Sequence, residues 1–447
     1  MRQQKPILLF CFFLAVLSCQ SNAFARRIDE ASYQYPYKNP YLATLTVAIM
    51  QGSENPTMSE IKDLRIKVLD HRNDIYLLEG MGTLRYRFYQ QNGPAPLVFI
   101  IPGLASSAYS GSARFLAELI ADNGFHAIIL PSPFNWNFTL AASVSAYPGN
   151  TQEDTQDLYS VMQLVLNDVR SRCSAKIGKI GVLGLSDGAL YSAYLSKMDS
   201  EKKRIGIDTY LLINPPVDLF DAAGKIDQMA DAGKDYETEQ KNYLEAYAIG
   251  VQAEALKNNI DDANYFADWN KRFRVNDKQS KYLIGKSVHA FIGDTLYVAD
   301  LANNGAILTP PINWWHRNNR LEEARSYGLI RYAKSVLVPR LKRIDNKEAT
   351  LKTLNNVNSI KNIQSVLEHN QAVFLMHNLD DVLVSEKDVT YLEKVFGKRA
   401  MIYPHGGHLG NLWYPENKKH ILDVFSPMLQ GFAQSNPGEV ENVLSKY

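Results

Sequence analysis

A serine between two glycines stands where the sequence changes from a strand pattern to a helix pattern. The sequence Gly-Leu-Ser-Asp-Gly at residues 184–188 follows an apolar run and precedes a helical run. A serine held in a tight strand-to-helix turn presents its hydroxyl above the sheet, and small residues two positions away on either side avoid clashes. The turn also places the Asp187 amide at a helix N-terminus, which favours negative charge. The pattern predicts that Ser186 is a nucleophile, although an ordinary glycine-flanked turn is the alternative.

A serine hydroxyl is a weak nucleophile at neutral pH, so it needs a base, and the base needs a carboxylate to orient it. Of nine histidines, His408 lies in the sequence Pro-His-Gly-Gly-His-Leu-Gly at 404–410, directly after the last expected strand. Its loop should therefore emerge at the carboxyl edge of the sheet beside Ser186. We expect His408 to be the base, with His405 as the alternative.

Two adjacent aspartates, Asp380 and Asp381, follow the strand expected before that one. A serine, then an aspartate, then a histidine along the chain resembles the order in the α/β-hydrolase superfamily. Many members carry His-Gly-x-x-Asp-x-x-Val at the aspartate, and residues 377–384 are similar to it, with Asn378 in place of glycine. The resemblance implies that Asp381 orients His408, with Asp380 as the alternative and a turn role for the other.

The same resemblance implies an oxyanion hole made of two backbone N–H groups. One would come from Asp187 and the other from Leu104, in the loop after the strand expected at 97–103, where Pro-Gly replaces the more common His-Gly. A structural glycine turn is the alternative for that loop.

Strands and helices alternate from residue 97 onward. Continuous apolar runs separated by helical segments are typical of a parallel sheet covered by helices on both faces. Strands are expected at 97–103, 126–131, 179–186, 209–216, 372–378 and 400–404, and helices at 112–123, 154–172, 387–396 and 416–432. We therefore expect an α/β-hydrolase fold, with its core in residues 96–216 and 372–433.

Residues 26–95 form an expected N-terminal extension with edge strands. Two runs in it, 65–70 and 83–90, alternate apolar and polar residues and predict an antiparallel pair at a sheet edge.

The sheet pattern stops over residues 217–371, far more than the dozen or so residues that a crossover needs. Most of this segment looks helical, so we expect a helical cap insertion over Ser186. Four aromatic residues are candidates to line a substrate pocket. Phe134 and Trp136 follow an expected strand, and packing under the insertion is their alternative. Trp314 and Trp315 lie in the insertion, and burial in the core is their alternative.

The first 25 residues resemble an export signal. Arg2 and Lys5 precede an apolar run at 6–17, about 12 residues long, whereas a membrane-spanning helix needs about 20. Residues 16–19 resemble the lipobox of bacterial lipoproteins, which implies lipidation of Cys19 and a lipid anchor on a membrane surface. Cleavage after Ala25 is the alternative. Either route predicts a bacterial cell-envelope protein, lipid-anchored or periplasmic.

The composition excludes some function classes. With 48 basic and 47 acidic residues, net charge +1, the chain has no positive field for a nucleic-acid backbone. No Cys-x-x-Cys, His-Glu-x-x-His or Gly-x-Gly-x-x-Gly sequence occurs, so we expect no metal and no cofactor.

Together these patterns predict an exported serine hydrolase that acts on a carboxylic ester or thioester, from a small-molecule or lipid acyl substrate. A serine peptidase or an acyltransferase is an alternative within the enzyme class. A non-catalytic envelope binding module on a hydrolase-like fold is the alternative outside it.

Overall fold

The computed structural model describes residues 24–52, 59–257, 263–345 and 348–430. Within these ranges the strands form one nine-stranded sheet with the order β1-β9-β8-β7-β6-β4-β5-β3-β2. All neighbouring pairs are parallel except β2 with β3 and β3 with β5. The strands are β1 (Arg26–Arg27), β2 (Glu60–Ile66), β3 (Leu84–Gln90), β4 (Ala95–Ile101), β5 (His126–Ile129), β6 (Ile177–Leu185), β7 (Ile207–Ile213), β8 (Val373–Asn378) and β9 (Ala400–Tyr403).

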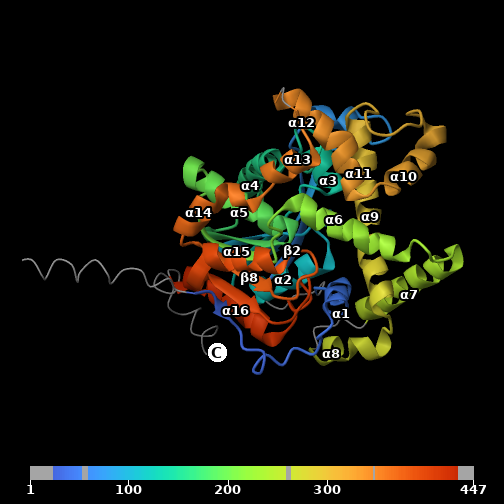
Figure 1. The fold of residues 1–447 in the computed structure, drawn as a ribbon. Helices are drawn as coiled ribbons and strands as arrows, with labels where there is room; N and C mark the ends of the chain where they lie inside the picture. Colours follow the sequence, from blue (N-terminus) through green and yellow to red (C-terminus); the bar gives the residue numbers. More distant parts are fainter. Residues whose placement is uncertain (1–23, 53–58, 258–262, 346–347, 431–447) are drawn as a thin grey trace, which may run out of the picture.

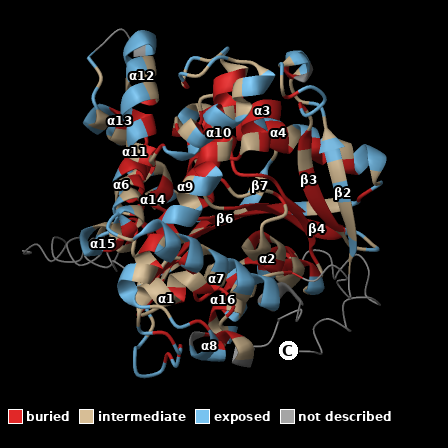
Figure 2. Ribbon diagram, turned by 90° about the vertical axis from the view of Figure 1, so that its right-hand side faces the viewer, coloured by how far each residue is buried: buried red, intermediate tan, exposed pale blue. Residues whose placement is uncertain are grey.

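Helices cover both faces of this sheet (Figure 1). One face packs against α4 (Thr151–Arg172), α5 (Asp187–Lys202) and α15 (Glu386–Phe396), and the other against α2 (Gly111–Asp122) and α16 (Pro415–Phe425). In β4, Leu97 and Phe99 point to the first face, whereas Val98 and Ile100 point to the second. The central strands are therefore buried on both sides (Figure 2), which explains their continuous apolar sequences. The predicted α/β-hydrolase fold is confirmed.

The N-terminal extension differs most from the sequence expectation. The expected antiparallel pair exists, but β2 covers residues 60–66 rather than 65–70. Since β2 is an edge strand with half-exposed residues on both faces, its apolar alternation is weak. The two-residue strand β1, at the opposite edge beside β9, is too short to leave a periodic signal. Helix α1 (Pro40–Leu45), which Asn39 caps, was also not expected.

The insertion is helical. Its longest helix, α9, packs against α6 and α10, and also against α3 (Trp136–Ala141) of the core. Helix α6 lies beside the end of the sheet at which Ser186 is located, whereas α7 and α8 extend toward α1 (Figure 1). No helix in the described ranges is long and apolar enough to cross a membrane. The helices are α6 (Leu219–Ala230), α7 (Thr238–Lys257), α8 (Ala263–Arg272), α9 (Asp277–Ala302), α10 (Arg317–Arg325), α11 (Leu329–Tyr332), α12 (Val338–Asp345), α13 (Leu351–Val357) and α14 (Gln364–His369).

Candidate active site

Ser186 occupies a strained turn between β6 and α5. Its backbone has φ +54° and ψ −120°, which a non-glycine residue rarely adopts. The turn allows β6, α5 and β4 to approach closely. A Cβ atom on Gly184 would lie 2.4 Å from Ser192 Oγ, and one on Gly188 would lie 2.2 Å from the Ile101 carbonyl oxygen. Both glycines are therefore required by space, as the sequence pattern indicates.

Ser186, His408 and Asp381 form one hydrogen-bond relay. His408 Nε2 lies 2.8 Å from Ser186 Oγ, and His408 Nδ1 lies 2.9 Å from Asp381 Oδ2 and 3.1 Å from Oδ1. Of the two histidines and two aspartates that the sequence left open, the structure brings His408 and Asp381 to the serine. A serine hydroxyl, an imidazole and a carboxylate in this order can act as a nucleophile, a base and the group that orients the base.

The Asp381 carboxylate is held by neutral donors as well as by His408. Its side chain is fully buried, Asn214 Nδ2 donates to Oδ2 at 2.7 Å, and the Leu383 N–H donates to Oδ1 at 2.8 Å. Burial raises the pKa of Asp381, but the charge and hydrogen bond of His408, with smaller effects from His377 and Leu383, outweigh it and lower the pKa below its usual value. Asp381 is therefore ionised and can stabilise a protonated His408.

Asp380 and Asn378 contact the loop of His408 rather than its ring. Asp380 accepts hydrogen bonds from the backbone N–H groups of Gly407 (2.9 Å) and Gly406 (3.3 Å). Asn378 Nδ2 donates to the Gly407 carbonyl oxygen at 2.8 Å, so the asparagine that replaces glycine in the family pattern binds this loop. His405 points away from the serine, with Nε2 2.9 Å from Glu30 Oε1.

Two backbone N–H groups beside Ser186 are available to a ligand. Leu104 and Asp187 line the same cavity as Ser186, and a Cβ on Gly103 would lie 3.3 Å from Ser186 Cβ. In the described part of the chain, neither the Leu104 nor the Asp187 N–H donates to a protein acceptor. They are the two groups that the sequence assigned to an oxyanion hole.

The Asp187 carboxyl group is buried without a well-aligned hydrogen bond to either oxygen. Burial raises the pKa of Asp187 to about 7, and the nearby Tyr191 hydroxyl offsets this only in part. That hydroxyl lies 3.1 Å from Asp154 Oδ2, which also accepts from the Gly149 N–H at 2.7 Å. Two buried acids thus lie behind the serine.

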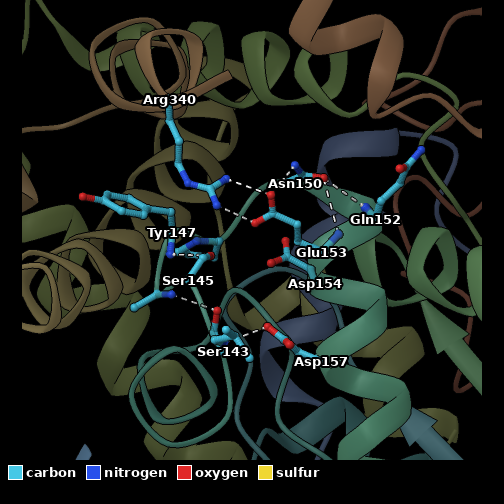
Figure 3. A network of polar contacts seen from close by, with 12 residues as sticks. Ser143, Ser145, Tyr147, Asn150, Gln152, Glu153, Asp154, Asp157 and Arg340 are labelled. Atoms are coloured by element: carbon cyan, nitrogen blue, oxygen red, sulfur yellow. Dashed lines mark hydrogen bonds and ion pairs between the residues drawn. The ribbon is translucent and has the colours of Figure 1, made fainter. Parts of the chain in front are cut away.

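The first turn of α4, which carries Glu153 and Asp154, contacts Arg340 of the insertion (Figure 3). Asn150 caps α4, and Glu153 in its first turn forms a bidentate ion pair with Arg340 of α12 at 2.7 and 3.1 Å. This contact holds the insertion against Gly149, which borders the cavity at Ser186.

The cavity has an almost entirely apolar wall, to which α6 and α11 of the insertion contribute. The lining residues are Leu104, Phe134, Gly149, Ser186, Asp187, Pro216, Leu219, Phe220, Ala222, Ala223, Ile226, Leu329 and Leu383.

Of the four candidate pocket aromatics, only Phe134 lines this cavity. Trp136 packs against the buried Leu140, Val298 and Leu301 instead. The expectation for Trp314 and Trp315 is corrected, because these side chains are 55% and 85% exposed and lie on the surface of the insertion. Trp314 stacks there with Arg317, whose guanidinium carbon lies 3.7 Å from the ring centroid. The indole ring therefore contacts a cation and solvent and does not face the cavity at Ser186.

Sequence reasoning missed three supporting residues: Asn214, Asn378 as a donor, and Thr44, whose hydroxyl accepts from the His408 N–H. Thr44 and Asn214 belong to no motif, and their partners are distant in sequence.

Cys19 lies outside the described residues. No group of three histidine, cysteine or acidic side chains in the described ranges could hold a metal ion.

No protein-family model and no curated protein matches the chain. Solved structures similar to it include an esterase from Pyrococcus furiosus, with 13% identity, a TM-score of 0.41, and coverage of 84% of this chain and 95% of that one. Carboxyl esterase 2 from Tuber melanosporum has 14% identity, a TM-score of 0.39, and coverage of 84% and 87%. The bacterial brefeldin A esterase has 12% identity, a TM-score of 0.39, and coverage of 94% of this chain and 91% of that one. At such scores the likeness carries no argument about function.

Proposed function

We propose that this chain is a serine hydrolase that cleaves a carboxylic ester or thioester through an acyl-enzyme. The observation that carries the proposal is the relay in which His408 contacts both Ser186 Oγ and the buried Asp381 carboxylate. A further support is that Ser186 lies in a strained turn beside two backbone N–H groups, those of Leu104 and Asp187, that have no acceptor among the described residues.

In the acylation step, Ser186 Oγ attacks the carbonyl carbon while His408 Nε2 takes the hydroxyl proton. The negative charge that develops on the carbonyl oxygen is stabilised by the N–H groups of Leu104 and Asp187. As the intermediate collapses, His408 returns the proton to the leaving oxygen or sulfur, and the acyl group stays on Ser186.

In the second step, water attacks the acyl carbon while His408 Nε2 takes its proton, and the carboxylic acid leaves as Ser186 is reprotonated. Throughout, Asp381 accepts the Nδ1–H of His408, which fixes the tautomer and stabilises the imidazolium. The depressed pKa of Asp381 keeps it ionised for this role.

The apolar wall supports a hydrocarbon acyl or alcohol group as the part of the substrate beside Ser186. Because the cavity measures only about 30 Å³, such a group must displace lining side chains to enter it. Phe134 from the core, Phe220 from α6 and Leu329 from α11 would contact that group.

Labelling with a fluorophosphonate probe tests the proposal. We expect the folded wild-type chain to be labelled and Ser186→Ala not to be. Ser196→Ala is a matched control, because Ser196 is a buried serine of α5 whose hydroxyl donates to Ala193 O at 2.7 Å. Turnover of nitrophenyl esters, thioesters and amides then separates esterase from peptidase activity. A folded wild type that neither reacts with the probe nor hydrolyses any of them would leave the binding-module alternative.

We further propose export and lipidation at Cys19, which the short apolar run and the lipobox-like residues 16–19 support. In a bacterial host, wild type should fractionate with membranes and Cys19→Ala with the soluble fraction. A soluble wild type that begins at Arg26 would refute the lipid anchor.

A further inference from the structure

The loop that carries His408 is covered by a segment from the other end of the chain. We call residues 30–46 the strap and residues 404–411 the histidine loop. The His408 N–H donates to Thr44 Oγ1 at 2.9 Å, and the Thr44 hydroxyl donates to the Pro40 carbonyl oxygen at 2.7 Å. The second bond uses the hydroxyl proton, so the oxygen is fixed as an acceptor for His408.

The backbones of the strap and the histidine loop touch directly. A Cβ on Gly407 would lie 2.2 Å from the Pro40 carbonyl oxygen, and one on Gly410 would lie 2.0 Å from the Ala43 carbonyl oxygen. Gly407 also has φ +56°. The glycines around His408 therefore make room for α1, in addition to allowing a tight turn.

Buried hydroxyl groups extend this contact. Tyr35 OH donates to the Gly410 carbonyl oxygen at 3.0 Å, and Thr46 Oγ1 lies 2.9 Å from the same oxygen. Asn411 Nδ2 donates to Tyr33 OH at 3.0 Å. Since Asp380 binds the N–H groups of Gly406 and Gly407, the histidine loop is held from β8 on one side and from the strap on the other.

We propose that the strap positions His408 for catalysis, with Thr44 as the positioning residue. This role rests on the proposed function, because it concerns the base of that reaction. His408 must stay within hydrogen-bond distance of both Ser186 and Asp381, and a misplacement of about 1 Å can cost a factor of about 100 in rate. Thr44 holds the backbone of the histidine itself, so it acts more directly than the contacts to the glycines.

Thr44→Val tests the proposal, because valine has the shape of threonine without its acceptor. We expect kcat and the rate of fluorophosphonate labelling to fall about 10- to 100-fold, with KM and the melting temperature close to wild type. Thr44→Ser, which keeps the hydroxyl, should retain most of the activity. The matched control is Thr155→Val in α4, where a buried threonine hydroxyl donates to Thr151 O at 2.6 Å. A kcat for Thr44→Val equal to that of Thr155→Val would overturn the proposal.

Hydrogen exchange gives a readout that does not need activity. Amides of residues 405–411 should exchange faster in Thr44→Val than in wild type, whereas Thr155→Val should leave them unchanged. Unchanged exchange in Thr44→Val overturns the role of the strap whatever the catalytic result. Faster exchange in a chain whose wild type reacts with no probe and hydrolyses no substrate would instead refute the proposed function. Tyr35→Phe, which removes the bond from the tyrosine hydroxyl to the Gly410 carbonyl oxygen, should shift both readouts in the same direction and serves if Thr44→Val does not fold.

Discussion

Asp187→Asn should make the stability of the protein less dependent on pH. The Asp187 pKa is about 7 in the folded protein against a usual value of 3.8, so folding shifts it upward. When folding raises the pKa of an acid, its contribution to stability is full below the unfolded pKa and is lost as the pH rises from about 4 to about 7. Ionisation of Asp187 in the unfolded chain lowers the free energy of unfolding by about 1.5 kcal/mol at pH 5 and by about 4 kcal/mol at pH 8. The difference, about 2.5 kcal/mol, should be absent in the asparagine variant.

Urea unfolding at pH 5 and pH 8, followed by tryptophan fluorescence, measures this effect as the change in the variant's stability relative to wild type. Groups that titrate in both proteins cancel in that comparison. Asp70→Asn is the control, because the Asp70 side chain is 95% exposed. The Asp187 backbone N–H is unchanged in the variant, so esterase activity should persist. Equal pH dependence in wild type and Asp187→Asn would refute the inference that this carboxyl group is buried and protonated.

Three further outcomes follow from the site. Asp381→Asn should lower kcat by about 10⁴-fold, because it favours the wrong His408 tautomer. Asp380→Asn keeps an acceptor for the Gly407 N–H and should lower kcat less than about tenfold. If steady-state kinetics gave the opposite order, Asp380 and not Asp381 would be assigned as the acid that orients His408. Gly188→Ala should destabilise the fold by about 3 kcal/mol, because its Cβ would lie 2.2 Å from Ile101 O, while Gly250→Ala, with open space around it, should be neutral or stabilising in the same denaturation assay. Leu329→Ala should enlarge the pocket and raise the ratio of kcat/KM for octanoyl esters to that for butyryl esters about tenfold, whereas Trp315→Ala should leave this ratio unchanged. An equal change in both variants would contradict the assignment of Leu329 to the pocket wall.

The strands and the chemistry-bearing residues of the core were predictable because their signals are local. Buried parallel strands such as β4 read as apolar runs, and the turn at Ser186 requires glycines at fixed positions. The choice between Asp380 and Asp381 needed the family resemblance, since both follow β8 directly.

The supporting residues were not predictable, because their role depends on contacts between distant segments. Thr44 and His408 are 364 residues apart, and Asn214 and Asp381 are 167 residues apart. The prediction that Trp314 and Trp315 line a pocket was wrong, and so was the alternative that they are buried in the core. Sequence alone does not show on which side of an insertion a tryptophan lies.

The contact between the strap and the histidine loop also bears on how the chain folds as it is made. During synthesis the strap leaves the ribosome before the histidine loop does. Because Thr44 and His408 are 364 residues apart, the strap has no histidine loop to pack against until the residues between them have been synthesised. In a chain truncated before residue 404, the carbonyl and hydroxyl groups of the strap that contact Gly407, His408 and Gly410 would therefore lack these partners.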